Sequence, residues 1–275
     1  ARLLIQDRLV TEGMGGVLPE QEEPSRFQRV LDVGCGTGGW LIQVAKTYPD
    51  VERLIGVDIS GKMVEYARAR ARAEGVGNRV EFCVMDTLRM LEFPNEYFHL
   101  INHRFGQSYL RTWDWTKLLQ EYRRVTQPGG IVRLTEGNSA IESNSPALTQ
   151  ITDLSIQTLH QGGYFFTPTG DGVISRLPTL LTNTNFQNVQ TREIVLEYRG
   201  GTPQCALFAQ DMEHLFRTGE PFLRKWIKLP ENYKALCQEA SQQMQQSDFL
   251  ARWHILTAWA VCPDQSGSSA GNYLW

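Results

Sequence analysis

The fold of this chain is decided by the stretch Val30-Leu-Asp-Val-Gly34-Cys-Gly36-Thr-Gly38-Gly-Trp40. Its first residues are largely apolar and predict a strand, and the glycines that follow predict a tight turn into a helix. Glycine lets the backbone of such a turn approach a ligand closely, and the N–H groups at the start of the helix then face a polar or anionic group. The stretch therefore predicts a ligand-binding turn between a strand and a helix.

Strand and helix patterns alternate along the chain from this turn onward. Short apolar segments predict strands, and the segments between them predict helices that end near glycine or proline. We expect strands at 29–33, 53–58, 80–84, 97–102 and 131–135, and helices at 40–48, 62–74 and 115–126. Because strands that alternate with helices of this length form βαβ units, the five strands are expected to be parallel in one sheet.

The regular alternation ends after the fifth strand. Two more strands are expected at about 188–199 and 252–262, with a helix at 173–185. The remaining segments, 137–172 and 200–251, are interpreted as insertions that form a helical cap over the sheet. We therefore divide the chain into an N-terminal helix and lid segment (1–28), one α/β domain (29–263) and a C-terminal tail (264–275).

Composition and charge argue against several classes of protein. The 275 residues carry a formal net charge of −3, and the basic run from Arg68 to Arg72 is typical of a solvated helix face, so nucleic acid is not expected as a partner. No segment has the apolar length of a membrane span and no secretory signal is recognised, so we expect a cytoplasmic location. The five cysteines are scattered without a C-x-x-C pair, and no clustered ligands predict a metal site.

Three carboxylates narrow the choice of ligand for the glycine turn. The turn satisfies the G-x-G-x-x-G pattern from Gly34 to Gly39, so an NAD-dependent oxidoreductase is one candidate. Asp32, however, would repel a pyrophosphate, whereas it suits a ligand that carries an ammonium group. Asp58 ends the second strand and can accept hydrogen bonds from ribose hydroxyls, and Asp86 follows the third strand, where it can accept one from an adenine amine.

These segments resemble the class I S-adenosylmethionine-dependent methyltransferases, particularly the UbiE-like group that acts on small molecules. The resemblance spans about residues 30–136 and includes Arg123-Arg-Val-Thr-Gln-Pro-Gly-Gly-Ile-Val-Arg-Leu134, which is similar to the family's segment before the fifth strand. The chain departs from the family at His99, where an Asp is common. The resemblance implies an α/β fold with a Rossmann-like seven-stranded methyltransferase sheet and helices on both faces. It also implies that S-adenosylmethionine is the cofactor and S-adenosylhomocysteine the product.

The resemblance further implies a role for individual residues of the cofactor site. Asp58 would hold the ribose of the cofactor. The other contacts would be divided among the methionine end (Asp32, Gly34, Gly36, Gly38), the adenine faces (Ile59, Met63), the adenine edge (Asp86, Thr87) and the sulfonium (Asn102 or His103).

Residues that act on the acceptor are sought where the strands end, because open parallel sheets bind ligands at that edge. His103 is the candidate general base, with a simple hydrogen bond to the loop as the alternative. Glu136 ends the fifth strand and is a candidate base, an anchor for the acceptor or a cap for the loop. His160, Tyr164 and Phe166 in the first insertion either line the acceptor pocket or pack the cap against the sheet.

Together these features predict methyl transfer to a small, largely apolar metabolite of natural-product or quinone type. The reaction would be an in-line displacement at a sulfonium that is already activated, so positioning supplies most of the rate. An NAD-dependent oxidoreductase and a non-catalytic S-adenosylmethionine-binding module remain the alternatives. The sequence determines neither the acceptor, nor the atom that is methylated, nor the oligomeric state.

Overall fold

The computed structural model of this chain describes residues 2–264, which form a mixed sheet with helices on both faces. The strands are β1 (Arg29–Val33), β2 (Arg53–Asp58), β3 (Val80–Val84), β4 (Phe98–Arg104), β5 (Thr126–Gly137), β6 (Glu142–Ser143), β7 (Gln187–Arg199) and β8 (Leu250–Val261). The α-helices are α1 (Arg2–Gly13), α2 (Gly39–Thr47), α3 (Gly61–Ala73), α4 (Asp114–Val125), α5 (Pro146–Gln161), α6 (Leu177–Asn183), α7 (Pro203–Trp226) and α8 (Tyr233–Gln243).

The strand order is β3-β2-β1-β4-β5-β8-β6, and β7 pairs with β8. The first five strands are parallel, while β8 runs antiparallel to both β5 and β7. The strand order reverses between β1 and β4, so the carboxyl ends of these two strands open a crevice in which α/β sheets bind ligands. The fold class expected from the sequence is confirmed.

The parallel strands are apolar on both faces because helices cover both of them. Val30 and Leu54 pack in a core with side chains of α2 and α3. Leu31 and Ile55, one residue further along, pack on the opposite face with side chains of α4 and α6. Successive residues of a strand point to opposite faces, so this pattern anchors the sheet between two helical layers.

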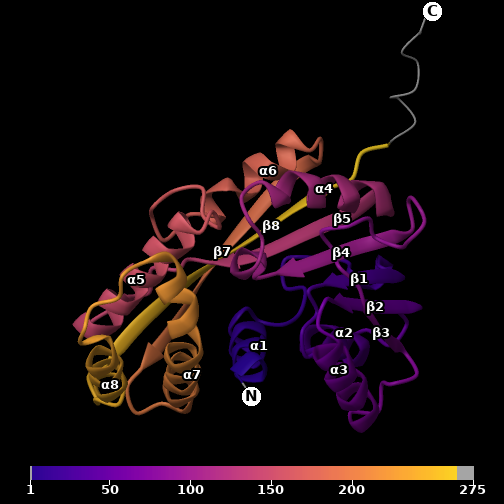
Figure 1. Cartoon of the computed structure of the whole chain (residues 1–275). Coiled ribbons are helices and arrows are strands. Elements are labelled where there is room, and N and C mark those ends of the chain that lie inside the picture. The colour runs from indigo at the N-terminus through magenta and orange to yellow at the C-terminus, as the bar shows by residue number, and fades with distance from the viewer. Residues whose placement is uncertain (1, 265–275) are drawn as a thin grey trace, which may run out of the picture.

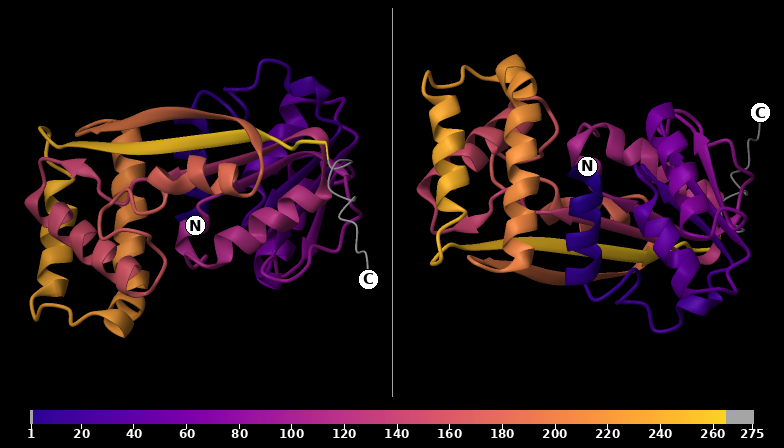
Figure 2. Two further views of the ribbon diagram at one scale, coloured as in Figure 1. Left: turned by 90° about the horizontal axis from the view of Figure 1, so that it is seen from above. Right: turned by 90° about the horizontal axis from the view of Figure 1, so that it is seen from below.

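The cap is formed by α5, α7 and α8 at the far end of the long strands β7 and β8, away from the parallel strands (Figure 1). It has a core of its own, in which Ala251 and Ile255 of β8 are buried with Phe208 of α7 and Leu236 of α8. Helix α1 packs against both α7 and α2, so it joins the cap to the parallel half of the molecule (Figure 2).

Three details of the fold differ from the sequence expectation. β5 begins at Thr126 instead of 131, because Thr126 pairs with Phe98. In addition, the Gly129 N–H donates a hydrogen bond to the Cys262 carbonyl, and the Cys262 N–H donates one to the Gly130 carbonyl. β4 continues to Arg104, which places His103 inside the strand. The two-residue strand β6 is an addition that pairs with β8.

The division into lid, domain and tail remains a prediction, and of the expected tail 264–275 all but residue 264 lies outside the described residues. Between residues 2 and 264, no helix combines the length and the apolar character needed to cross a membrane.

Candidate cofactor and acceptor site

The glycine turn between β1 and α2 lies at the carboxyl edge of the sheet. Gly34, Gly36 and Gly38 have φ angles of +65°, +52° and +72°, in the left-handed region that favours glycine. A Cβ at Gly34 would lie 2.7 Å from the Tyr109 hydroxyl oxygen, and one at Gly38 would lie 2.5 Å from the ring of Phe82. These two positions therefore have no room for a side chain. Gly34 and Gly36 line the cavity described below and Gly38 does not, and their contacts with the cofactor remain predictions.

Asp58 supports the turn from the end of the neighbouring strand β2. Its Oδ2 accepts a hydrogen bond from the Gly36 N–H at 2.9 Å, and its Oδ1 accepts one from the Ser60 N–H at 2.8 Å. The side chain also lines the cavity described below, where the remaining lone pairs of the carboxylate can accept hydrogen bonds from a ribose.

The Asp32 carboxylate is buried beneath the turn and lines the same cavity. Burial raises the pKa of Asp32 to about 7, although the charge of Arg104 and a hydrogen bond from Asn102 Nδ2 at 2.7 Å both lower it. A carboxylate desolvated in this way is stabilised by a cation. The residues at this end of the cavity therefore fit the ammonium group of S-adenosylmethionine.

A chain of buried polar groups holds Asp32 from below. Asn102 accepts a hydrogen bond at its Oδ1 from Arg133 Nη1, and Arg133 Nε donates to Glu20 Oε1, each at 2.7 Å. The side chains of Arg133 and Glu20 are each 1% exposed. Burial alone would raise the pKa of Glu20, but the charge and hydrogen bonds of Arg133 hold it below its usual value. Asn102 thus lies behind Asp32, not on the cavity wall, and orients it.

The residues expected around the adenine lie outside the enclosed cavity. Ile59 follows Asp58 directly and is 69% exposed, so its apolar surface is free to cover a flat ring. Asp86 Oδ1 accepts a hydrogen bond from the Leu88 N–H at 3.1 Å. Thr87 is buried, and the Met63 N–H donates to Ser60 Oγ, which caps the N-terminus of α3. The adenine contacts assigned to Ile59, Met63, Asp86 and Thr87 remain predictions.

His103 is fully buried in β4 and does not line the cavity. Its Nε2 lies 2.6 Å from the Tyr109 hydroxyl oxygen, and its Nδ1 lies 3.0 Å from that of Tyr122. Burial lowers the pKa of His103 to about 3, so the imidazole is neutral at pH 7. Tyr109 does line the cavity, so His103 meets the site through this tyrosine. Sequence reasoning missed Tyr109, whose only signal is its place just after a strand at the carboxyl edge.

Glu136 is also buried away from the cavity and holds the loop that carries Tyr109. Its Oε1 accepts a hydrogen bond from the Gly106 N–H at 2.7 Å and a longer one from the Gln107 N–H. Burial raises the pKa of Glu136 to about 8, although these backbone donors lower it. The arrangement matches the loop-cap alternative for this residue.

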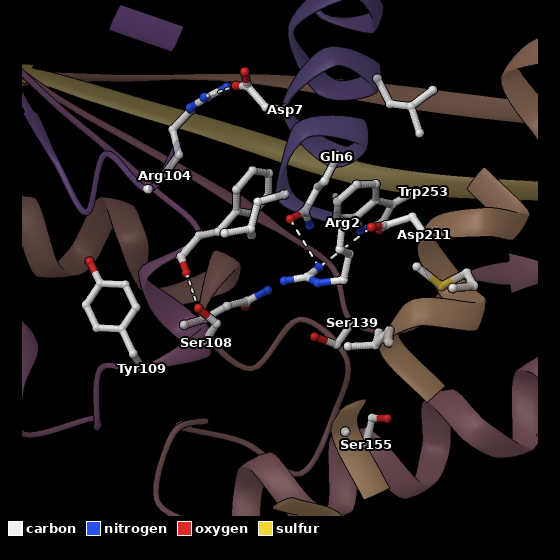
Figure 3. Close-up of a pocket in the computed structure, with 18 of the residues that line it drawn as sticks. Arg2, Gln6, Asp7, Arg104, Ser108, Tyr109, Ser139, Ser155, Asp211 and Trp253 are labelled. Carbon is white, nitrogen blue, oxygen red and sulfur yellow. Dashed lines mark hydrogen bonds and ion pairs between the residues drawn. The ribbon is translucent and has the colours of Figure 1, made fainter. Parts of the chain in front are cut away.

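One cavity of about 490 Å³ extends from the glycine turn into the cap. Apolar side chains of α5, α7 and β8 form its inner wall, among them Ile151, Phe208, Phe216 and Trp253. Helix α1 lines another side, and its Asp7 forms an ion pair with Arg104 at 2.5 Å (Figure 3). The cavity therefore joins a polar end at the sheet to an apolar end under the cap.

His160, Tyr164 and Phe166 do not line this cavity. Tyr164 packs edge to face on Phe222 of α7, and the Arg111 guanidinium lies 3.9 Å from the centre of its ring. Phe166 is partly buried against the core of the sheet, and His160 faces a separate surface groove. Their placement matches the packing alternative, while Leu159 of the same segment lines the cavity.

Two polar groups on the cap side of the cavity gave no sequence signal. Asp211 of α7 and Tyr198 of β7 are both buried and both line the cavity.

Among residues 2–264, no three His, Cys, Asp or Glu side chains gather as a metal site would require.

Comparison with known proteins points to one family. Residues 30–130 match the model of a methyltransferase domain. A demethylmenaquinone methyltransferase of Geobacillus kaustophilus (strain HTA426) is 31% identical over 121 residues, which are 44% of this chain and 47% of that protein. Methyltransferase GfsG of Streptomyces halstedii is 29% identical over 205 residues, which are 65% of this chain and 71% of that protein. The chain spans about half the length of the demethylmenaquinone methyltransferases it matches.

A solved structure supports the same fold. Phosphoethanolamine N-methyltransferase 2 of Haemonchus contortus, in complex with phosphomonomethylethanolamine and S-adenosylhomocysteine, matches with a TM-score of 0.51 and 22% identity. The match covers 86% of this chain and 49% of that chain, and at this identity it shows the fold alone. The domain match, the relatives and the glycine turn together support a class I S-adenosylmethionine-dependent methyltransferase that is similar to the UbiE group.

Proposed function

We propose that this chain transfers the methyl group of S-adenosylmethionine to a small, largely apolar acceptor held under the cap. The observation that carries the proposal is the single cavity that joins Asp32 and the glycine turn to an apolar interior. A quinone or natural-product ring system fits such walls, and one relative is named for demethylmenaquinone. A cavity of about 490 Å³ between α1 and the cap suits a small molecule better than a nucleic acid.

In this proposal the side chains of the protein bind and orient the cofactor and the acceptor. S-adenosylmethionine supplies, when bound, a methyl group already activated on a sulfonium. Asp32 binds the ammonium group and Asp58 the ribose, while α1 and the cap exclude water from the apolar end. A neutral His103 is a poor base at pH 7, so we assign it to positioning the Tyr109 hydroxyl beside Gly34.

Binding experiments test the cofactor first. Calorimetric titration of the full chain should show binding of S-adenosylhomocysteine and none of NAD. Asp32→Asn should weaken that binding at least about tenfold, because it removes a charge-assisted contact. The matched control is Asp50→Asn, which neutralises an exposed aspartate in a loop away from the cavity. Binding of NAD without S-adenosylhomocysteine would overturn the proposal in favour of an oxidoreductase.

An acceptor screen then tests catalysis. Methyl-labelled S-adenosylmethionine is incubated with the protein and a panel of demethylated quinones and polycyclic phenols, and products are detected by mass spectrometry. We expect at least one labelled product. Cofactor binding without any product across the panel would instead support a non-catalytic binding module.

A further inference from the structure

Asp211 places a carboxylate in the apolar part of the cavity. It lies on α7 close to Phe208 and Met212, and it is only 4% exposed. Its Oδ1 has no hydrogen-bond partner among the described residues. Burial raises the pKa of Asp211 to about 6, although Arg2 lowers it. Asp211 Oδ1 is thus held at the inner wall of the cavity without a hydrogen-bond donor from the described residues.

Tyr198 of β7 adds a second polar group at the same place. The residue is 3% exposed, and its hydroxyl also finds no hydrogen-bond partner within the described part of the chain. Burial, and after it the negative charge of Asp211, raise the pKa of Tyr198, so the two groups lie within electrostatic reach of each other. Both side chains line the cavity, although they come from different elements.

Arg2 balances the Asp211 charge only in part. Its Nη1 lies 3.8 Å from Asp211 Oδ1, which is an ion pair but too long for a hydrogen bond. The same nitrogen donates to Gln6 Oε1 at 3.4 Å, as the dashed lines in Figure 3 show. In the same view Arg2 and Asp211 lie apart from Tyr109, which is at the other side of the pocket (Figure 3).

Buried polar groups without partners destabilise a fold, so proteins rarely keep them without a reason. Two of them line one cavity, and Tyr198 stacks on Phe208, one turn before Asp211 on α7. Both are explained if a ligand supplies the missing hydrogen bonds. The donor must reach Asp211, and the rest of the ligand must be apolar, because Phe208 and Phe216 line the same cavity. A neutral donor fits better than a cation, since Arg2 already provides positive charge.

We infer that Asp211 and Tyr198 form an acceptor-binding subsite that holds a neutral O–H group of an aromatic or polycyclic substrate, opposite the cofactor end. This inference rests on the proposed function, which it deepens by naming the substrate class. The O–H group donates to Asp211, and its oxygen accepts a hydrogen bond from the Tyr198 hydroxyl. The subsite thereby sets which hydroxylated ring enters, and in which orientation.

Three small probes test the subsite on the full chain saturated with S-adenosylhomocysteine: 1-naphthol, naphthalene and 1-naphthylmethylammonium. Titration calorimetry should give an affinity for 1-naphthol at least about tenfold above that for naphthalene, as one hydrogen bond to a buried carboxylate predicts. In Asp211→Leu the ratio should fall to about two or less, and Tyr198→Phe should lower it about threefold. Asp211→Asn, which keeps a carbonyl acceptor, should give an intermediate ratio.

The matched control is Glu213→Gln, which neutralises an exposed carboxylate on the same helix and should leave the ratio unchanged. A second readout is thermal unfolding without ligand. Asp211→Leu removes a buried carboxylate that has no hydrogen-bond donor on Oδ1 and only a long ion pair with Arg2. It should therefore raise the melting temperature, whereas loss of a merely structural contact would lower it.

Equal affinities for 1-naphthol and naphthalene in the wild type would overturn the inference, as would absence of 1-naphthol binding or tighter binding of the ammonium probe. A destabilised Asp211→Leu with an unchanged ratio would do the same. Because S-adenosylhomocysteine is titrated beforehand, its failure to bind would count against the proposed function and is distinguished from a failure of the subsite.

Discussion

Lowering the pH is expected to weaken the binding of S-adenosylhomocysteine through protonation of Asp32. In the free protein burial raises the pKa of this carboxyl to about 7, with Arg104 and Arg133 lowering it and Asp7 raising it. The ammonium group of the ligand favours the charged carboxylate, so the pKa of Asp32 falls when the ligand binds. Binding therefore releases a proton from Asp32 below pH 7.

The size of the effect follows from the pKa of the free protein. Well below pH 7, each unit by which the pH falls reduces the binding free energy by about 1.4 kcal/mol, which is tenfold in affinity. Above pH 7 the affinity becomes constant. Between pH 7.5 and pH 5.5 the dissociation constant should rise about 25-fold, which corresponds to about 1.9 kcal/mol. The affinity thus increases with pH and then levels off.

Titration calorimetry from pH 5.5 to 8, in buffers of different ionisation enthalpy, measures both the affinity and the protons released. Two controls isolate the group responsible. 5′-Methylthioadenosine lacks the ammonium group and should bind with little dependence on pH, and Asp32→Asn should remove the dependence for S-adenosylhomocysteine. An affinity independent of pH in the wild type, or the same dependence in Asp32→Asn, would refute the reasoning.

Two further predictions concern the buried networks. Tyr109→Phe should lower the free energy of unfolding in urea by about 1–3 kcal/mol, because the buried imidazole of His103 loses a partner; an unchanged midpoint would contradict this. Arg133→Met should lower it by about 3–5 kcal/mol, because the Glu20 carboxylate is left buried and unpaired. Adding Glu20→Gln should recover part of that loss, and purely additive effects in this double-mutant cycle would show that the pair is not coupled.

The parallel half of the fold could be predicted closely because its signals are local. β1, β2 and β3 begin and end at the residues expected, since an apolar run bounded by turn residues is contained within a few positions. The glycines lie in the expected turn between a strand and a helix, and Gly34, Gly36 and Gly38 have positive φ angles that glycine adopts without strain. Asp32 and Asp58 could be placed for the same reason, because each is next to a strand end.

The acceptor side could not be predicted in this way. His160, Tyr164 and Phe166 form a polar and aromatic group in the sequence, but none of them lines the cavity. Tyr164 packs on Phe222, Phe166 packs against the core of the sheet, and His160 faces a surface groove. Asp211 and Tyr198 carry no pattern, because one aspartate in a helix and one tyrosine in a strand are ordinary on their own.

The sequence by itself therefore determined the α/β class, the glycine turn and the carboxylates beside it, because strand period and backbone conformation depend on neighbouring residues. Only the tertiary structure decided that His103 acts behind Tyr109, that Asn102 and Arg133 support Asp32, and that α1, β7 and α7 close around one cavity. The physical reason is that burial and hydrogen-bond partners arise between segments far apart in the chain. The glycine turn with its carboxylates predicts the methyl donor, whereas the packing of the cap shapes the space in which we propose that the acceptor binds.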